Sequence, residues 1–267
     1  MTVADRELVE TFERDGVVLV RDAFDDGWID ELRKAVDRVM ASPGPLSKDY
    51  ARDGKGKFFT DHQMRRRDEG FRRFLAESPA VALAASLLRA GRLNLVDEHL
   101  LVKEPGTENP TYWHQDMPYF EVGGSQFASF WIPLDPVTRD SGRMRFVRGS
   151  HRWGKIYQPI RIGLGERVDE AGSFDGPAPD IDGAPDAYDI AEFDLDPGDC
   201  LFFHAAVLHG AHPNRTAHMR RRAHSLRFAG DDARFKPRPY VPSQEGTRDL
   251  VDGGPLDSER YPVVWPA

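Results

Sequence analysis

The sequence predicts a mainly β fold, a sandwich or jelly roll with flanking α-helices. From about residue 93 onward, short stretches rich in β-branched and aromatic residues alternate with Gly and Pro, and no helical pattern lies between them. Before that point, apolar residues recur instead at helical spacing. A chain of 267 residues is long enough for one domain with a substantial core, so we expect a single domain over 1–267.

Three helices are expected at the start of the chain, over residues 8–16, 28–40 and 78–91. In the second segment, the apolar residues from Trp28 to Met40 follow a period of about 3.6 residues. In the third, Ser78 and Pro79 supply an N-cap and a first-turn proline. These helices are predicted to cover one face of a sheet, and nothing in them indicates chemistry.

The expected strands are short and follow one another with few helical interruptions. They lie at 93–103, 112–116, 126–134, 144–148, 191–195, 200–204 and 221–228.

Composition narrows the classes of function. The formal charge of −8 argues against nucleic-acid binding, because the basic run 220–222 is short and leads into a predicted strand. No stretch reaches the roughly 18 apolar residues of a membrane span, and the N-terminus is charged from Asp5 without a signal-peptide core. The lone Cys200 excludes an internal disulfide and a thiolate metal site. We expect a cytoplasmic monomer or homodimer that acts on a small molecule.

A histidine and a carboxylate two residues apart, His114 and Asp116, are the main indication of chemistry. On a strand, residues i and i+2 share a face about 6.6 Å apart, so both side chains can approach one ion. A further histidine, His209, lies far downstream in the segment 209–214. Two histidines and one carboxylate form the facial triad of non-haem Fe(II) sites with open coordination positions.

Several further motifs resemble, in the same order, those of the phytanoyl-CoA dioxygenase family of Fe(II)/2-oxoglutarate oxygenases. They are FERDGVVLV at 12–20, WHQDMPYF at 113–120, WIPLDPV at 131–137, GSHRWG at 149–154, PGDCLFFHAAVLHGAHPN at 197–214 and RRAHSLRF at 221–228. The resemblance covers most of the chain. It implies a double-stranded β-helix of the cupin-like jelly-roll type, with N-terminal helices 1–91 packed on a core at 92–235.

The resemblance also implies a reaction. His114, Asp116 and His209 would hold Fe(II), 2-oxoglutarate would take two open positions and O2 the third. The products would be succinate, CO2 and a hydroxylated small organic substrate. Related halogenases have a small residue in place of Asp116, so the carboxylate favours hydroxylation. Two alternatives stay open: desaturation, cyclisation or epimerisation with the same cofactors, and a non-catalytic β-helix binding module.

Two of the predicted roles, the second histidine ligand and the arginine that binds 2-oxoglutarate, have more than one candidate residue. His204 and His212 lie near His209, but His209 matches the family's His-Gly position. For the distal carboxylate of 2-oxoglutarate, the family places an arginine on the strand after this histidine, and a guanidinium is the natural bidentate partner. Spacing favours Arg220, whereas matching the strand itself favours Arg221. We favour Arg221, because the turn before the strand absorbs an extra residue more easily.

Five further residues are expected near the metal, the cosubstrate or the substrate on less specific grounds. Trp131 matches a family tryptophan near the cosubstrate, although a core aromatic explains it equally well. His99, a polar residue in an apolar strand, is expected to contact 2-oxoglutarate. Gln115 is expected in a second shell around the metal, and Tyr119 and Phe120 in the substrate wall. For Lys103, a charged position on the surface is as consistent with the sequence as a contact in the site.

The segment 155–190 interrupts the strand pattern. It contains four prolines, five glycines and eight acidic residues against three basic ones. Connections of this length are usually functional lids or disordered segments. We therefore predict a mobile lid, with an inert solvated insertion as the alternative.

Overall fold

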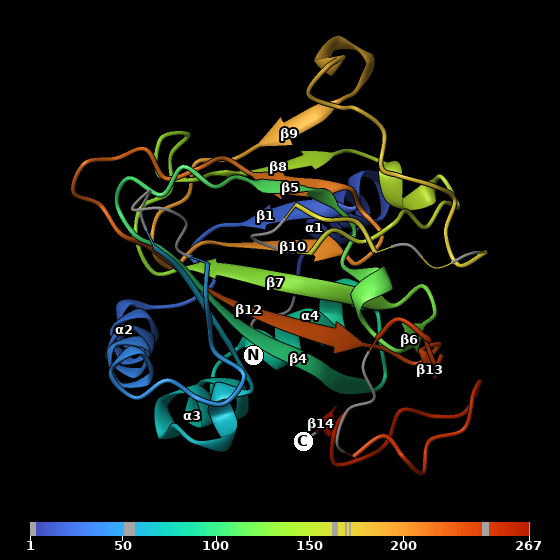
Figure 1. The fold of residues 1–267 in the computed structure, drawn as a ribbon. Helices are drawn as coiled ribbons and strands as arrows, with labels where there is room; N and C mark the ends of the chain where they lie inside the picture. The colour runs from blue at the N-terminus through green and yellow to red at the C-terminus, as the bar shows by residue number, and fades with distance from the viewer. Residues whose placement is uncertain are drawn as a thin grey trace.

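The computed structural model describes residues 4–50, 57–161, 165–168, 170, 172–241 and 246–266. Its strands form two main antiparallel sheets that face each other (Figure 1). The large, 8-stranded sheet has the order β1 (Val17–Val20), β10 (Cys200–His204), β7 (Phe127–Pro133), β12 (Arg221–Ala229), β4 (Leu93–Lys103), β3 (Phe58–His62) and β2 (Lys48–Asp49), with β14 (Val263–Trp265) paired to β4. The small sheet has the order β5 (Thr111–His114), β11 (His209–Ala211), β8 (Met144–Val147) and β9 (Ile190–Glu192). A separate pair joins β13 (Arg234–Phe235) to β6 (Val122–Gly123). This arrangement is the expected cupin-like jelly roll.

Four α-helices accompany the sheets: α1 (Arg6–Asp15), α2 (Asp26–Ala41), α3 (Glu69–Glu77) and α4 (Ala80–Leu88). In Figure 1, α2 and α3 lie on the opposite side of the large sheet from β5 and β8. Helices α1, α2 and α3 begin at aspartate N-caps, as in α1, where the Asp5 carboxylate accepts from the Leu8 amide at 2.9 Å. Gly16 ends α1 in the left-handed conformation with φ 76°, which glycine adopts without strain.

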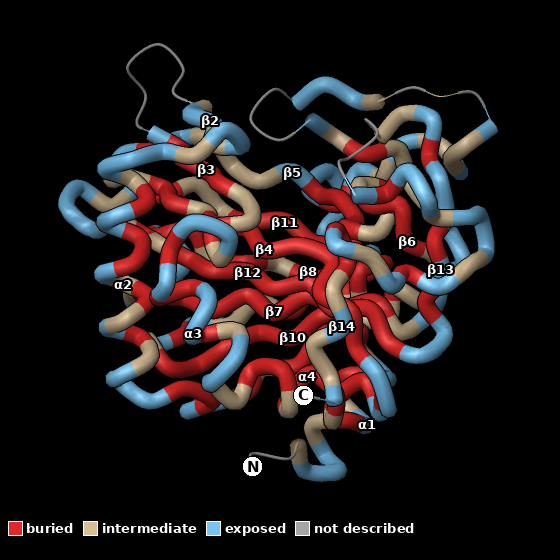
Figure 2. Tube along the Cα trace, turned by 90° about the horizontal axis from the view of Figure 1, so that it is seen from below, coloured by how far each residue is buried: buried red, intermediate tan, exposed pale blue. Residues whose placement is uncertain are grey.

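Both faces of the large sheet are buried (Figure 2). Phe130 and Phe202 point toward the helices and join their apolar residues in one core. Their strand neighbours Trp131 and Phe203 point the other way, toward the small sheet, in a second core. This two-sided burial explains why β1, β7 and β10 are almost continuously apolar. Cys200 is fully buried, in keeping with a structural role.

Several elements differ from the sequence-based expectation. The segment 1–91 supplies not only β1, in the stretch 12–20 that resembles the family's opening helix and strand, but also β2 and β3 to the large sheet. Helix α3 was not expected; Asp68 caps it, and Phe71 and Phe74 bury its inner face. Strand β11 is only three residues long and contains a glycine, so it carries almost no strand signal.

No helix in the described part of the chain is long and apolar enough to cross a membrane.

Candidate metal centre

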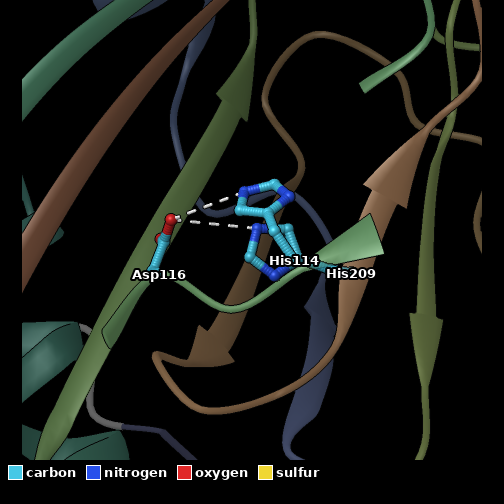
Figure 3. A group of neighbouring side chains, drawn as sticks. All are labelled: His114, Asp116 and His209. Carbon is cyan, nitrogen blue, oxygen red and sulfur yellow. Dashed lines mark ion pairs between the residues drawn. The ribbon is translucent and has the colours of Figure 1, made fainter. Parts of the chain in front are cut away.

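His114, Asp116 and His209 converge between the two sheets (Figure 3). His114 ends β5 and His209 begins β11, and the two residues are directly paired across these strands. The expected strand 112–116 is wrong at its end, because β5 stops at His114 and Asp116 has the helical dihedral angles φ −73° and ψ −36°. Asp116 therefore approaches the histidines through a turn, and the i, i+2 spacing on one strand face is not what brings it there.

The ligand atoms of the three side chains all lie within 4.8 Å of one another. Oδ1 of Asp116 is 3.8 Å from Nε2 of His114 and 3.9 Å from Nε2 of His209. Each imidazole is oriented by its other nitrogen, with Nδ1 of His114 2.7 Å from the Tyr112 carbonyl and Nδ1 of His209 3.0 Å from the Val207 carbonyl. A proton on each Nδ1 leaves both Nε2 lone pairs directed at one point beside Asp116.

The electrostatics of this group favour a cation. Burial lowers the pKa of His209 to about 3, with a further contribution from His114, and burial likewise lowers the pKa of His114. Burial alone would raise the pKa of Asp116, but the charge of Arg227 and the neighbouring histidines lower it instead. Two neutral imidazoles and one ionised carboxylate are the protonation states that bind a divalent metal.

The cavity beside the triad has mainly apolar walls, formed by residues such as Phe58, Leu101, Met144 and Phe203. Arg221 also lines this cavity, with its guanidinium 5.3 Å from the centre of the Trp131 ring. Arg221 is only 2% exposed, and its Nε has no hydrogen-bond partner among the described residues. Burial lowers its pKa to about 10, so it stays charged at neutral pH. A buried cation with an unused donor is therefore available to an anionic ligand.

Lys103 is a second buried basic residue beside Arg221, its cross-strand partner. The lysine is fully buried and donates from Nζ to the His212 carbonyl at 3.0 Å. Burial lowers its pKa well below the usual value, and the charge of Arg221 lowers it further. The expectation that Lys103 could equally well be a charged residue on the surface is wrong, because the side chain is buried. Only the cross-strand register, which the sequence did not show, places it here.

Arg220 does not reach the cavity. Its side chain is 40% exposed and pairs with Glu104 at 2.8 Å. Alternation along β12 directs Arg220 and Arg222 away from Arg221, and Arg222 forms a bidentate pair with Asp135. Of the two arginines considered for 2-oxoglutarate, the structure brings only Arg221 to the site.

The histidines that rivalled His209 have other partners. Nε2 of His204 lies 2.8 Å from the Ser125 carbonyl, and its Nδ1 accepts from the Ala206 amide. His212 lies 2.9 Å from Glu192, outside the triad.

His99 lines the cavity as expected, and its Nε2 has no hydrogen-bond partner among the described residues. Its ring stacks on that of His62 at 4.0 Å, and Nδ1 of His62 lies 2.9 Å from Asp97. Burial lowers the pKa of His99 well below its usual value, with a further contribution from His62. His99 therefore presents a neutral, unsatisfied nitrogen to the cavity.

Gln115, which lies between the two ligands His114 and Asp116, forms hydrogen bonds with the backbone of two neighbouring segments. Gln115 donates to the carbonyls of Lys155 and Ala206 and accepts from the Tyr157 amide, at 2.8–2.9 Å. Gln115 thus fixes the start of the 155–190 segment beside the chain that carries the ligands, and its place around a bound metal stays a prediction.

The two aromatic residues expected in the substrate wall have different surroundings. The Tyr119 ring stands edge-on to His114 at 5.7 Å, and its hydroxyl bonds both the amide and the carbonyl of Ile160. Phe120 packs against Phe127 in an apolar cluster against which Tyr119 also packs. Neither aromatic residue is among those that line the cavity beside the triad, and their place in a substrate wall stays a prediction.

Comparisons with known proteins agree with this geometry. The chain is 23% identical over 291 residues to the dioxygenase cdmD of Talaromyces verruculosus, across 96% of this chain and 86% of that protein. The carbocyclase SnoK from nogalamycin biosynthesis, described as α-ketoglutarate dependent, has the same fold, with a TM-score of 0.76, 21% identity and coverage of 97% and 96%. The epimerase SnoN, solved with Fe3+, α-ketoglutarate and nogalamycin RO, aligns with a TM-score of 0.75, 25% identity and coverage of 97% of each chain.

The profile of the phytanoyl-CoA dioxygenase family matches residues 12–223, which is most of the chain. The chain belongs to the phytanoyl-CoA dioxygenase family.

Proposed function

We propose that the protein is an Fe(II)- and 2-oxoglutarate-dependent dioxygenase that hydroxylates an unactivated C–H bond of a small organic substrate. The observation that carries this proposal is the buried group His114, Asp116 and His209, with its ligand atoms directed at one point. When bound, the metal and 2-oxoglutarate supply the oxidising chemistry with O2, and succinate and CO2 are released. The protein contributes orientation, charge and exclusion of water.

Arg221 and Lys103 support the assignment of 2-oxoglutarate as the cosubstrate. Arg221 lines the same cavity as the triad, and Lys103 lies beside it as its cross-strand partner. A dicarboxylate can therefore chelate the metal at one end and satisfy a buried cation at the other. We propose that Trp131 flanks the distal carboxylate and that neutral His99 offers a hydrogen bond to the bound cosubstrate.

The direct test is anaerobic titration of the Fe(II)-loaded protein with 2-oxoglutarate, followed by admission of O2. We expect a visible metal-to-ligand charge-transfer band on titration, and then slow succinate formation without any added substrate. A protein that forms neither the band nor succinate is not an oxygenase of this class. Aerobic screening of a metabolite library with the same succinate readout then identifies the substrate.

Carbocyclisation or epimerisation of the substrate is a second candidate outcome, because SnoK is a carbocyclase and SnoN an epimerase. Product analysis separates these outcomes from hydroxylation, because only hydroxylation adds the mass of one oxygen atom to the substrate.

Replacing Lys103 by methionine should affect stability and binding in opposite directions. The lysine pKa is lower in the folded protein than in the unfolded chain, so the unfolded chain binds more protons between the two values. The wild-type free energy of unfolding therefore gains from this residue as pH rises, and a neutral side chain removes that dependence. We expect the thermal midpoint of the metal-free variant to rise by about 2–4 °C per kcal/mol regained. We expect its 2-oxoglutarate affinity to fall about tenfold. Equal 2-oxoglutarate affinity in both proteins would remove Lys103 from the cosubstrate site.

We also propose that 155–190 closes over the site as a lid, although 162–164, 169 and 171 lie outside the described residues. The start of the segment is attached to the turn after β5, which carries Asp116, through Gln115 and Tyr119. Farther along, Ile181 is buried against the outer face of the small sheet. Attachment at both places lets the stretch between them close the cavity and exclude water.

The variant Tyr119→Phe tests the lid because it removes both hydrogen bonds to Ile160 and keeps the ring beside His114. We expect limited proteolysis within 155–190 to become severalfold faster, and more 2-oxoglutarate to be consumed per product formed. Tyr188→Phe, a tyrosine of the same segment that packs on Trp153, is the matched control. If Tyr119→Phe is cleaved at the wild-type rate, with and without 2-oxoglutarate, the segment is an inert insertion.

A further inference from the structure

The two carboxylate oxygens of Asp116 have different surroundings. Oδ2 accepts from the Ser129 hydroxyl at 2.8 Å and from Nε of Arg227 at 3.0 Å. Oδ1 accepts from Nη2 of Arg227 at 3.2 Å and otherwise faces His114 and His209. Each oxygen has two lone-pair directions, so Oδ2 is fully used. One lone pair of Oδ1 is left, on the side of the histidines.

Arg227 is held in place by a second carboxylate. The residue is 7% exposed on β12, and its Nη1 lies 3.6 Å from Oδ2 of Asp97. Asp97 is itself fixed, with His62 at 2.9 Å and Arg260 at 3.7 Å. Burial alone would lower the pKa of Arg227, but the charges of Asp116 and Asp97 raise it. The guanidinium is thus a permanent cation that cannot easily turn away from Asp116.

We propose that Arg227 is a positioning residue that limits Asp116 to metal binding through a single oxygen, and that this keeps adjacent coordination positions free for a chelating cosubstrate. The inference rests on the proposed Fe(II)/2-oxoglutarate function. A carboxylate without its outer partners is free to turn and bind a metal through both oxygens, which takes one more position. A cosubstrate that needs two adjacent positions then competes with Asp116 itself. Arg227 and Ser129 prevent this by occupying Oδ2.

The test compares Arg227→Met with Arg222→Met. Methionine keeps most of the volume that packs on the Phe120 ring, 5.1 Å from the guanidinium. Arg222 follows Arg221 on the same strand, but its bidentate partner is Asp135, away from the triad. Each full-length variant is loaded with Co(II) under anaerobic conditions, and its visible spectrum is recorded before and during titration with 2-oxoglutarate.

We expect Arg227→Met to change the Co(II) spectrum before any 2-oxoglutarate is added, and to weaken 2-oxoglutarate binding about tenfold to a hundredfold, the usual range for an outer partner of a metal ligand. Arg222→Met should match the wild type in the Co(II) spectrum before 2-oxoglutarate is added, the measurement that reports on Asp116. The Fe(II) charge-transfer band of Arg227→Met should stay weaker even at saturating 2-oxoglutarate, because the second oxygen of Asp116 holds the position. An Arg221→Met variant should differ in needing more 2-oxoglutarate to reach a full-strength band.

The inference and the proposed function fail in different ways. If Arg227→Met has the spectrum of Arg222→Met and reaches a full-strength band, Arg227 does not set the coordination of Asp116, and the function stands. If the wild type binds neither Co(II) nor Fe(II), the function is wrong and the inference with it. If Arg227→Met does not fold, Ser129→Ala removes the other Oδ2 donor, and the same spectral change, in smaller degree, is expected. An unchanged Ser129→Ala spectrum then overturns the inference.

Discussion

Replacement of His209 by alanine is expected to abolish turnover and to weaken Fe(II) binding by more than about a hundredfold, which exceeds the usual effect of losing an outer partner. His209 supplies one of the three ligand atoms that the described residues bring to this centre, and its Nε2 is already oriented by the bond from Nδ1 to the Val207 carbonyl. Because the residue is 3% exposed and its burial favours the neutral form, the variant should fold without leaving a buried charge behind. Anaerobic metal titration with Fe(II) or Co(II) measures the effect directly.

The matched control is His212→Ala. His212 is three residues away, but it pairs with Glu192. We expect this variant to bind metal like the wild type. The opposite ranking, with His212→Ala inactive and His209→Ala unaffected, would show that the ligand assignment is wrong.

Asp116→Ala should also eliminate metal binding, but it is a less clean test. Removing this carboxylate leaves Arg227 buried without its main partner, which costs about 3–5 kcal/mol of stability. A lower thermal midpoint is therefore expected for Asp116→Ala and not for His209→Ala.

Replacement of Arg221 by methionine should raise the 2-oxoglutarate concentration required for half-maximal turnover by at least about thirtyfold. Losing one partner of a desolvated charge pair costs about 2–5 kcal/mol, and each 1.4 kcal/mol corresponds to about tenfold in affinity. Arg221 is 2% exposed and has an unused Nε donor in the cavity, so no water replaces the lost contact easily. Initial rates of succinate formation against 2-oxoglutarate concentration provide the measurement.

Arg220→Met is the control, since the neighbouring arginine is 40% exposed and pairs with Glu104. A surface pair of this kind contributes at most about 1 kcal/mol, so the 2-oxoglutarate requirement should change little. Arg221→Lys should recover only part of the affinity, because an ammonium group cannot form the bidentate contact. If Arg220→Met shows the larger effect, the distal carboxylate binds elsewhere than the structure indicates.

Much of this protein could be predicted from its sequence by itself. Strand β4 was predicted with its observed limits, Leu93–Lys103, and β10 likewise at Cys200–His204, because turn residues bound both segments and apolar residues recur within them. The identity of the family and the three metal-site candidates also followed from local motifs, His114-x-Asp116 and the His-Gly pair at 209. Local sequence carries this information because strand pattern, turn residues and ligand type are all properties of neighbouring positions.

Only the tertiary structure decided which residues surround those candidates. Asp116 reaches the histidines through a turn, and Arg227, more than a hundred residues away, binds it from β12. Lys103 and Arg221 meet only because β4 and β12 pair in one register, and a shift of one residue would direct both side chains to the opposite face. Register, burial and cross-strand partners depend on contacts between distant segments. No local pattern in the sequence encodes them, and so the triad was visible in the sequence while the charges that orient it were not.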